Sequence, residues 1–227
     1  MTARRTVALL PMKANSERVR GKNFRDLGGR PLFRWMLDTL LDVAEIDAVV
    51  INTDARAELA AAGLVDSERV IMRDRPAELC GDLVSMNKVL ADDVEHVDAS
   101  VYLMTHATNP LLSADTIGAA LRRFAEDGEA DSLFSVTRVQ TRFYRADGSA
   151  VNHDPAVLLR TQDLEPWFEE NSCLYLFTGA SFRATQARIG RAPILFETPR
   201  LESIDIDEPD DWVLAEAVVQ WRAARTA

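Results

Sequence analysis

The segment Leu9–Asn23, LLPMKANSERVRGKN, marks the point where a buried strand is expected to give way to a long polar loop. The apolar run Val7–Leu10 is long enough for a buried strand, too short for a helix, and stopped by Pro11. Residues 11–25 are almost all polar. In a doubly wound α/β sheet, ligands bind at the carboxyl ends of the strands, where this loop would lie.

The loop has the side chains that bind phosphate groups. It contains Lys13, Arg18, Arg20, Lys22 and Arg25, the short polar residues Asn15, Ser16 and Asn23, and the single acid Glu17. Cations and backbone N–H groups near a glycine, here Gly21, suit a polyphosphate. The alternative is a solvated surface loop. The loop matches neither a P-loop nor a GxGxxG fingerprint.

The composition indicates a globular protein and excludes several partners. The 227 residues carry a net charge of −10, which argues against non-specific binding to nucleic acid or to an anionic membrane. Cys80 and Cys173 are far apart in sequence and are expected to be reduced thiols in a cytoplasmic protein. The sequence shows no signal peptide and no apolar stretch long enough to span a membrane.

Strands that alternate with amphipathic helices predict one doubly wound α/β domain over residues 1–227. After Val7–Leu10, strands are expected at Asp47–Thr53, Glu68–Met72, Ala99–Thr105, Ala130–Arg138, Ser172–Phe177, Pro193–Phe196 and Glu202–Ile206. Residues 140–171 differ, because turn signals at Asp147-Gly148 and Asp154-Pro155 predict a hairpin-rich arm. Aromatic residues in this arm suggest the hypothesis that it packs on a second subunit.

The segment Ser203–Asp207 alternates polar and apolar residues. On a strand, Asp205 and Asp207 would share one face, and two neighbouring carboxylates need a positive group between them. Mg²⁺ that bridges to substrate phosphates fits this need. The alternative is that Asp207 only caps the last helix, expected from about Pro209 to Arg225.

Five motifs, in order along the chain, resemble those of the CMP-sugar synthetases, the cytidylyltransferases that activate sialic acids and ketodeoxyoctulosonate. They are Pro11–Ser16 with Gly21-Lys22-Asn23, Arg75–Leu79 with Asp82 and Ser85, Thr108–Leu111, Asn171, and Ser203–Asp207. The resemblance spans residues 7–218, which is nearly the whole chain.

The resemblance implies a Rossmann-like nucleotidyltransferase fold, a homodimer with an arm that reaches the other subunit, and CMP transfer from CTP to an acidic acceptor with release of pyrophosphate. It implies that CTP contacts Leu10, Pro11, Met12, Lys13, Ala14, Asn15, Ser16, Lys22, Asn23, Arg75, Asp82 and Ser85. Lys22, Lys13 and Arg75 would be the catalytic cations, and Asp205 and Asp207 would hold Mg²⁺.

The acceptor stays open, because the chain departs from the sialic-acid enzymes around its expected site. The residues assigned to the acceptor are His106, Thr108, Asn109 and Asn171, and Glu169-Glu170 replaces the Arg-Pro of those enzymes. Both a nonulosonic-type sugar acid and a small phosphonate, as in phosphonoformate cytidylyltransferases, fit the pattern. The arginines Arg138, Arg142, Arg145 and Arg160 of the arm could hold the negative group of either. A nucleotidyltransferase that uses UTP or GTP and a non-catalytic nucleotide-binding regulator are the rival functions.

Overall fold

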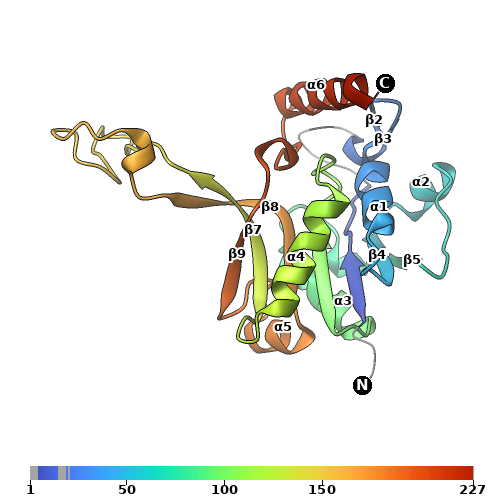
Figure 1. The fold of residues 1–227 in the computed structure, drawn as a ribbon. Coiled ribbons are helices and arrows are strands. Elements are labelled where there is room, and N and C mark those ends of the chain that lie inside the picture. The colour runs from blue at the N-terminus through green and yellow to red at the C-terminus, as the bar shows by residue number, and fades with distance from the viewer. Residues whose placement is uncertain (1–4, 15–18, 20, 227) are drawn as a thin grey trace.

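A seven-stranded sheet forms the centre of the protein in the computed structural model, which describes residues 5–14, 19 and 21–226 (Figure 1). The strand order is β5-β4-β1-β6-β8-β7-β9. The strands are β1 (Thr6–Leu9), β4 (Ala48–Thr53), β5 (Val70–Asp74), β6 (Val101–Thr105), β7 (Ser132–Val139), β8 (Trp167–Phe177) and β9 (Pro193–Glu197). Every pairing is parallel except those that β8 makes with β6 and β7.

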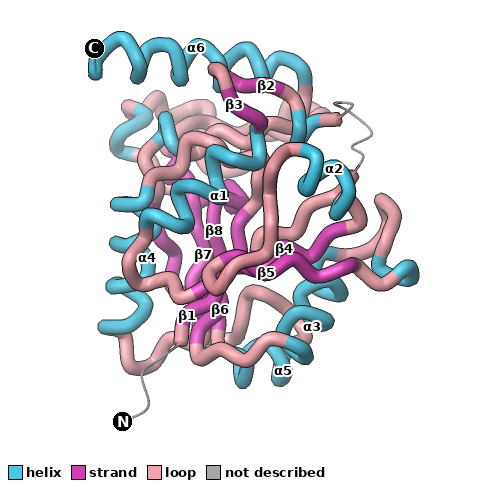
Figure 2. Tube along the Cα trace, turned by 90° about the vertical axis from the view of Figure 1, so that its right-hand side faces the viewer, coloured by secondary structure: helices cyan, strands magenta, loops and turns pink. Residues whose placement is uncertain are grey.

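Helices cover both faces of the sheet, as Figure 2 shows. In β1 and the residue after it, Ala8 and Leu10 point into one apolar core, and Val7 and Leu9 point into the other. The helices α1 (Leu32–Asp42), α2 (Arg56–Ala61) and α4 (Ala114–Glu126) supply the first core, and α3 (Met86–His96) and α5 (Gly179–Thr185) supply the second. The predicted doubly wound α/β fold is therefore confirmed.

The sheet has a topological switch point at β1. The chain leaves β1 for its neighbour β4 through α1 on one face, and it reaches the other neighbour, β6, through α3 on the opposite face. The order of the strands therefore reverses at β1, and in open α/β sheets ligands bind outside the carboxyl ends of the strands at such a point.

A third apolar cluster joins the last helix to a short hairpin, and these two elements lie side by side at the top of Figure 1. Helix α6 (Pro209–Thr226) contributes Trp212 and Val219, and it packs on the two-stranded hairpin of β2 (Asp26–Leu27) and β3 (Arg30–Pro31). Gly28 in the hairpin turn has φ of +62°, and a Cβ atom there would lie 2.6 Å from Val219 Cγ1. Among the described helices, none is both long and apolar enough to cross a membrane.

The arm projects from the sheet as an extension of β7 and β8 (Figure 1). It was expected at residues 140–171, but β8 already begins at Trp167, which pairs with Val139. The last five residues of the expected arm therefore belong to a regular strand. Beyond the ladder, the connection contains the isolated bridge between Tyr144 and Ala150 and the short 3-10 helix η3 (Thr161–Asp163).

The expected strand Glu202–Ile206 is wrong. Glu202 ends the 3-10 helix η4 (Arg200–Glu202), and residues 203–208 have no regular secondary structure. Alternation of polar and apolar residues identifies a strand only where a partner strand is available. Here Ile206 N donates to Thr108 O at 2.9 Å and Asn109 Nδ2 donates to Ile204 O at 3.5 Å, so the segment docks on the loop after β6 instead.

Candidate active site

The loop after β1 is attached to the carboxyl end of β4. Met12 N donates to Asn52 O at 3.0 Å, and Ala14 N donates to Asp54 Oδ1 at 2.7 Å. Asn23 Nδ2 closes the loop from its other end, because it donates to Lys13 O at 3.0 Å. The structure thus uses Asn23 to shape the loop. Asn15, Ser16, Glu17, Arg18 and Arg20 lie outside the described residues.

Lys22 connects the basic loop to the acidic segment near the other end of the chain. It lies in the 3-10 helix η1 (Lys22–Phe24), and its side chain is 10 % exposed. Its Nζ atom donates to Ile206 O at 2.7 Å and lies 3.2 Å from Asp207 Oδ1. The two sequence motifs, more than 180 residues apart, therefore share one site at the switch point of the sheet.

Asp205 has the features of a cation ligand. Its Oδ1 atom is buried and has no hydrogen-bond partner among the described residues. Burial, assisted by the charge of Asp207, raises the pKa of Asp205, while a hydrogen bond with Thr108 opposes the shift. A hard divalent cation would satisfy this oxygen and stabilise the carboxylate.

Substrate oxygens would complete such a cation site. The described residues contain no cluster of three or more His, Cys, Asp or Glu side chains that could enclose a metal ion. Mg²⁺ commonly takes one or two carboxylates and fills its other positions with water and substrate phosphates. The residues present therefore fit a cation that arrives with a phosphorylated substrate.

Lys13 and Asp82 form an ion pair between the loop after β1 and the segment that leads into α3. Lys13 Nζ lies 2.8 Å from Asp82 Oδ1, and the two side chains are 38 % and 45 % exposed. Exposed ion pairs of this kind contribute little free energy. An incoming phosphate can therefore compete with Asp82 for Lys13 at low cost. Asp82 precedes Ser85, which occupies the N-cap position of α3.

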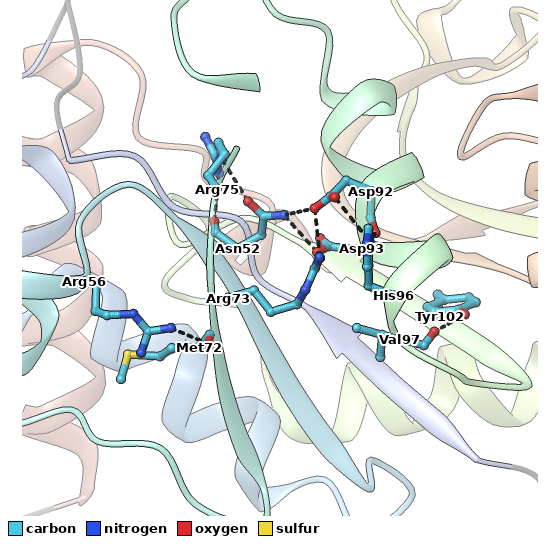
Figure 3. Close-up of polar contacts among 10 residues, drawn as sticks. All are labelled: Asn52, Arg56, Met72, Arg73, Arg75, Asp92, Asp93, His96, Val97 and Tyr102. Carbon is cyan, nitrogen blue, oxygen red and sulfur yellow. Dashed lines mark hydrogen bonds and ion pairs between the residues drawn. The ribbon is translucent and has the colours of Figure 1, made fainter. Parts of the chain in front are cut away.

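Arg75 is buried, and Figure 3 shows its contact with Asn52. Its guanidinium donates to Asn52 Oδ1 at 2.9 Å, to Asn52 O at 2.8 Å and to Met12 O at 3.2 Å. Burial lowers the pKa of Arg75. Because three of its hydrogen bonds hold the backbone and side chains of β4 and the loop, the geometry suits a positioning role better than direct contact with a reacting atom.

Asn52 extends this network to α3 (Figure 3). Its Nδ2 atom donates to Asp93 Oδ1 at 2.9 Å and to Asp92 Oδ2 at 3.0 Å, and Arg73 forms ion pairs with both carboxylates. Burial raises the pKa of Asp93 to about 6, although Asn52 and Arg73 oppose the shift. The network joins β4, β5, α3 and the loop after β1 into one rigid support.

The four residues expected at the acceptor divide into two groups. Asn109 is fully buried, and Nδ2 of Asn171 donates to Thr198 Oγ1 at 2.7 Å and to Thr137 Oγ1 at 3.1 Å, so both asparagines serve the framework. His106 and Thr108 lie in the loop after β6, beside Asp205 and Asp207. Burial and the charges of Arg188 and Lys22 lower the pKa of His106 to about 4, so its imidazole is neutral at physiological pH.

Sequence reasoning missed the cluster of Arg188, Tyr175 and Glu170 on the same side of the site. Arg188 stacks on the Tyr175 ring at 3.8 Å, and its Nη2 atom lies 3.2 Å from Glu170 Oε1. The Tyr175 hydroxyl also donates to Glu170. The one available signal was the acidic pair Glu169-Glu170 before Asn171. Nothing in the sequence around Arg188 indicated its position.

Comparison with known proteins identifies the family of the chain. The family model for cytidylyltransferases matches residues 7–217. The chain belongs to the cytidylyltransferase family. The fold resembles that of a CMP:2-keto-3-deoxy-manno-octonic acid synthetase complexed with CTP, with a TM-score of 0.68, 15% identity, and coverage of 96% of this chain and 99% of that one. It also resembles 4-diphosphocytidyl-2C-methyl-D-erythritol synthase from Anaerococcus prevotii, with a TM-score of 0.69, 13% identity, and coverage of 96% of both chains.

Three characterised relatives are similar over almost the whole chain. N-acylneuraminate cytidylyltransferase B of Danio rerio is 27% identical over 94% of this chain, which spans about half of that protein (51%). Pseudaminic acid cytidylyltransferase of Campylobacter jejuni is 23% identical, with coverage of 93% of this chain and 95% of the relative. CMP-N,N'-diacetyllegionaminic acid synthase of Legionella pneumophila is 26% identical, with coverage of 95% and 97%.

Proposed function

We propose that this protein transfers CMP from CTP to a hydroxyl group of a nonulosonic-type sugar acid and releases pyrophosphate. The observation that carries the proposal is the contact of Lys22 with Ile206 O and Asp207, which joins a cationic loop to a carboxylate pair at the switch point of the sheet. The names of the relatives support a sugar acid over a phosphonate as the acceptor.

The residues proposed for CTP are those of the loop after β1 and of the entrance to α3. They are Leu10, Pro11, Met12, Lys13, Ala14, Asn15, Ser16, Lys22, Asn23, Arg75, Asp82 and Ser85. Lys13 would leave Asp82 and bind the phosphates, and Lys22 would neutralise charge on the triphosphate. Arg75 and Asn23 would keep the loop in place through the hydrogen bonds described above.

In the proposed reaction, the acceptor oxygen attacks the α-phosphorus of CTP, and the bond between this phosphorus and the bridging oxygen to the β-phosphorus breaks. Pyrophosphate leaves with the electron pair, and the hydroxyl proton passes to solvent. Asp205 and Asp207 would hold Mg²⁺, which supplies Lewis-acid stabilisation of the charge that develops on the phosphates. The imidazole of His106 is neutral at the working pH. It can donate a hydrogen bond to the acceptor or accept one from it, but it cannot offset the negative charge of the acceptor.

The proposal includes a homodimer of single-domain chains in the cytoplasm. Large apolar side chains on the arm support the dimer, because Leu158 is 85 % exposed and Phe168 is 46 % exposed. The free thiols of Cys80 and Cys173 are consistent with a reducing compartment.

Release of pyrophosphate from CTP and Mg²⁺ tests the proposal, with N-acetylneuraminic, pseudaminic and legionaminic acids, 3-deoxy-manno-octulosonate and phosphonoformate as acceptors. We expect turnover with at least one sugar acid. Asp205→Asn and Asp207→Asn should lower kcat/KM by about 10²- to 10³-fold, while CTP should still raise the melting temperature. Asp210→Asn is the matched control, because Asp210 is exposed in the first turn of α6.

Three results would contradict the proposal. CTP binding without turnover on any acceptor would favour the regulator, and a larger thermal shift with UTP or GTP would favour a different nucleotidyltransferase. Turnover with phosphonoformate alone would replace the sugar acid by a phosphonate.

A further inference from the structure

Arg188 lies in the connection between α5 and β9, where the chain passes close to the proposed site. Its guanidinium covers the Tyr175 ring at 3.8 Å, and its Nη1 atom lies 4.0 Å from Met104 Sδ near the carboxyl end of β6. Its backbone N donates to Asn87 Oδ1 at 3.3 Å, and Asn87 is two residues after Ser85 in the first turn of α3. Arg188 therefore lies between the nucleotide side of the site and the loop that carries His106.

The positive charge of Arg188 acts on His106 inside the site. It contributes, after burial, to the low pKa of His106, and Lys22 contributes in the same direction. The side chain is 21 % exposed, so the guanidinium is partly open to a ligand. An arginine in this position offers a carboxylate two parallel hydrogen bonds, which a lysine cannot do.

The other described cations near the site are held by protein groups. Lys22 contacts Ile206 O and Asp207, and Arg75 is hydrogen-bonded to the loop. Lys13 faces Asp82 on the nucleotide side. An acidic acceptor must nevertheless bring a negative group next to a triphosphate. That approach is unfavourable unless a cation stands on the acceptor side.

We propose that Arg188 binds the carboxylate of the acceptor, and that in the free protein the carboxylate of Glu170 occupies the position of the acceptor carboxylate. Glu170 Oε1 lies 3.2 Å from Arg188 Nη2, and its side chain is 42 % exposed, so it can turn into solvent when the acceptor carboxylate arrives. Arg188 is then the specificity-determining residue of the acceptor side. This inference rests on the proposed CMP transfer to a sugar acid.

The loop that carries Arg188 is held rigidly enough for this role. Asp131 accepts hydrogen bonds from Arg191 N at 2.8 Å and from Ala192 N at 3.0 Å, and Gly190 N donates to Ser132 Oγ at 2.8 Å. Since the backbone is anchored at Arg188 itself and at residues 190–192, only the side chains of Arg188 and Glu170 need to move on binding.

Steady-state kinetics with CTP, Mg²⁺ and the sugar acid that the wild type uses best test the inference. Arg188→Gln should raise the KM for the acceptor by about 10- to 100-fold and leave the KM for CTP within about twofold, because a charge-assisted hydrogen bond is lost on the acceptor side alone. Arg191→Gln is the matched control, since it removes the same charge from an exposed position three residues along. The acceptor KM of Arg188→Lys should lie between those of Arg188→Gln and Arg191→Gln.

Glu170→Gln separates recognition from a purely structural ion pair. If Glu170 competes with the acceptor for Arg188, its neutralisation should lower the acceptor KM by a few-fold. If the ion pair were only structural, Arg188→Gln and Glu170→Gln would change the acceptor KM in the same direction and would lower the melting temperature by similar amounts.

The outcomes distinguish this inference from the proposed function. An active wild type with the same acceptor KM in Arg188→Gln and Arg191→Gln would overturn the role of Arg188 and leave CMP transfer intact. An unchanged or higher acceptor KM in Glu170→Gln would overturn the displacement. A wild type that binds CTP but turns over none of the sugar acids would overturn the proposed function and this inference together.

Discussion

At the scale of single residues, Asp93 is the carboxylate whose surroundings are most unusual for a charged group. It is fully buried in α3, and its Oδ2 atom has no hydrogen-bond partner in the described part of the chain. Asn52 and Arg73 contact its other oxygen, yet burial dominates and raises its pKa to about 6. The native protein therefore binds a proton at Asp93 more tightly than the unfolded chain does.

The melting temperature should reveal this difference as a function of pH. A raised carboxyl pKa contributes stability that is complete below about pH 4 and is lost as the pH rises through about 6. Because asparagine does not titrate, the melting temperature of the wild type relative to Asp93→Asn should rise by roughly 3–6 °C from pH 7 to pH 5. Differential scanning calorimetry measures this difference in melting temperature. Asp98→Asn, at an exposed position, should show no such trend, and a difference that falls toward pH 5 would contradict the shift.

At the scale of elements, the N-termini of α3 and α4 begin with the same residue type but are built differently. Ser113 caps α4, because its Oγ atom accepts from Thr116 N at 3.2 Å and bonds Glu202 Oε2 at 2.9 Å. Ser85 has the extended backbone of an N-cap, but among the described residues its hydroxyl makes no capping hydrogen bond. A hydroxyl that does not cap its helix is available to a ligand.

Alanine substitution should separate these two serines. Ser113→Ala should lower the free energy of unfolding by about 1–2 kcal/mol, because an N-cap hydrogen bond is lost. Ser85→Ala should change this free energy by less than about 0.5 kcal/mol but raise the KM for CTP by about five- to tenfold. Urea denaturation and pyrophosphate release measure the two effects. A loss of stability in Ser85→Ala equal to that in Ser113→Ala would show that Ser85 is structural.

The connection between α5 and β9 allows a second test at this scale. A Cβ atom on Gly190 would lie 2.2 Å from Asp131 Oδ1, the carboxylate that anchors the connection. Gly190→Ala should therefore destabilise the fold by about 1–3 kcal/mol and raise the acceptor KM more than the CTP KM, since Arg188 would be displaced. Gly128→Ala is the control, because a Cβ atom there would contact nothing within 4 Å. Equal effects of the two substitutions would contradict the anchoring.

At the scale of the whole molecule, the arm is a part of the protein that exposes large apolar side chains. Trp167 is 41 % exposed although Phe143 stacks on it at 5.2 Å, and Phe168 beside it is 46 % exposed. The ladder of β7 and β8 carries these side chains away from the two cores of the sheet (Figure 1). A second subunit would cover them.

Light scattering after size exclusion tests this arrangement. The wild type should elute as a dimer at micromolar concentration, and the double substitution Trp167→Glu with Phe168→Glu should give a monomer, because the charges cannot be buried in an apolar contact. Val65→Glu, at an exposed apolar residue on the body of the protein, should remain dimeric. A monomeric wild type, or a dimer that survives both arm charges, would contradict the proposed interface.

The sequence predicted the fold and the two motifs of the site because both depend on local patterns. An apolar run stopped by Pro11 and followed by a cationic loop is sufficient to predict a phosphate site at the end of a strand, and alternating strands and helices are sufficient for the α/β fold. The family match over residues 7–217 confirms the resemblance that these motifs indicated.

Tertiary structure decided the parts that depend on contacts between distant residues. Period-two alternation around Asp205 resembled a strand, but no partner strand was there to pair with it, and the segment docked on Thr108 instead. Arg75 and Asn171 are predicted to meet ligands, and only the folded chain shows that they also form hydrogen bonds with Met12 and Thr198. Arg188 reached the site only because folding stacked it on Tyr175. No local pattern encodes such a contact, since the residues that define it come from separate strands and loops.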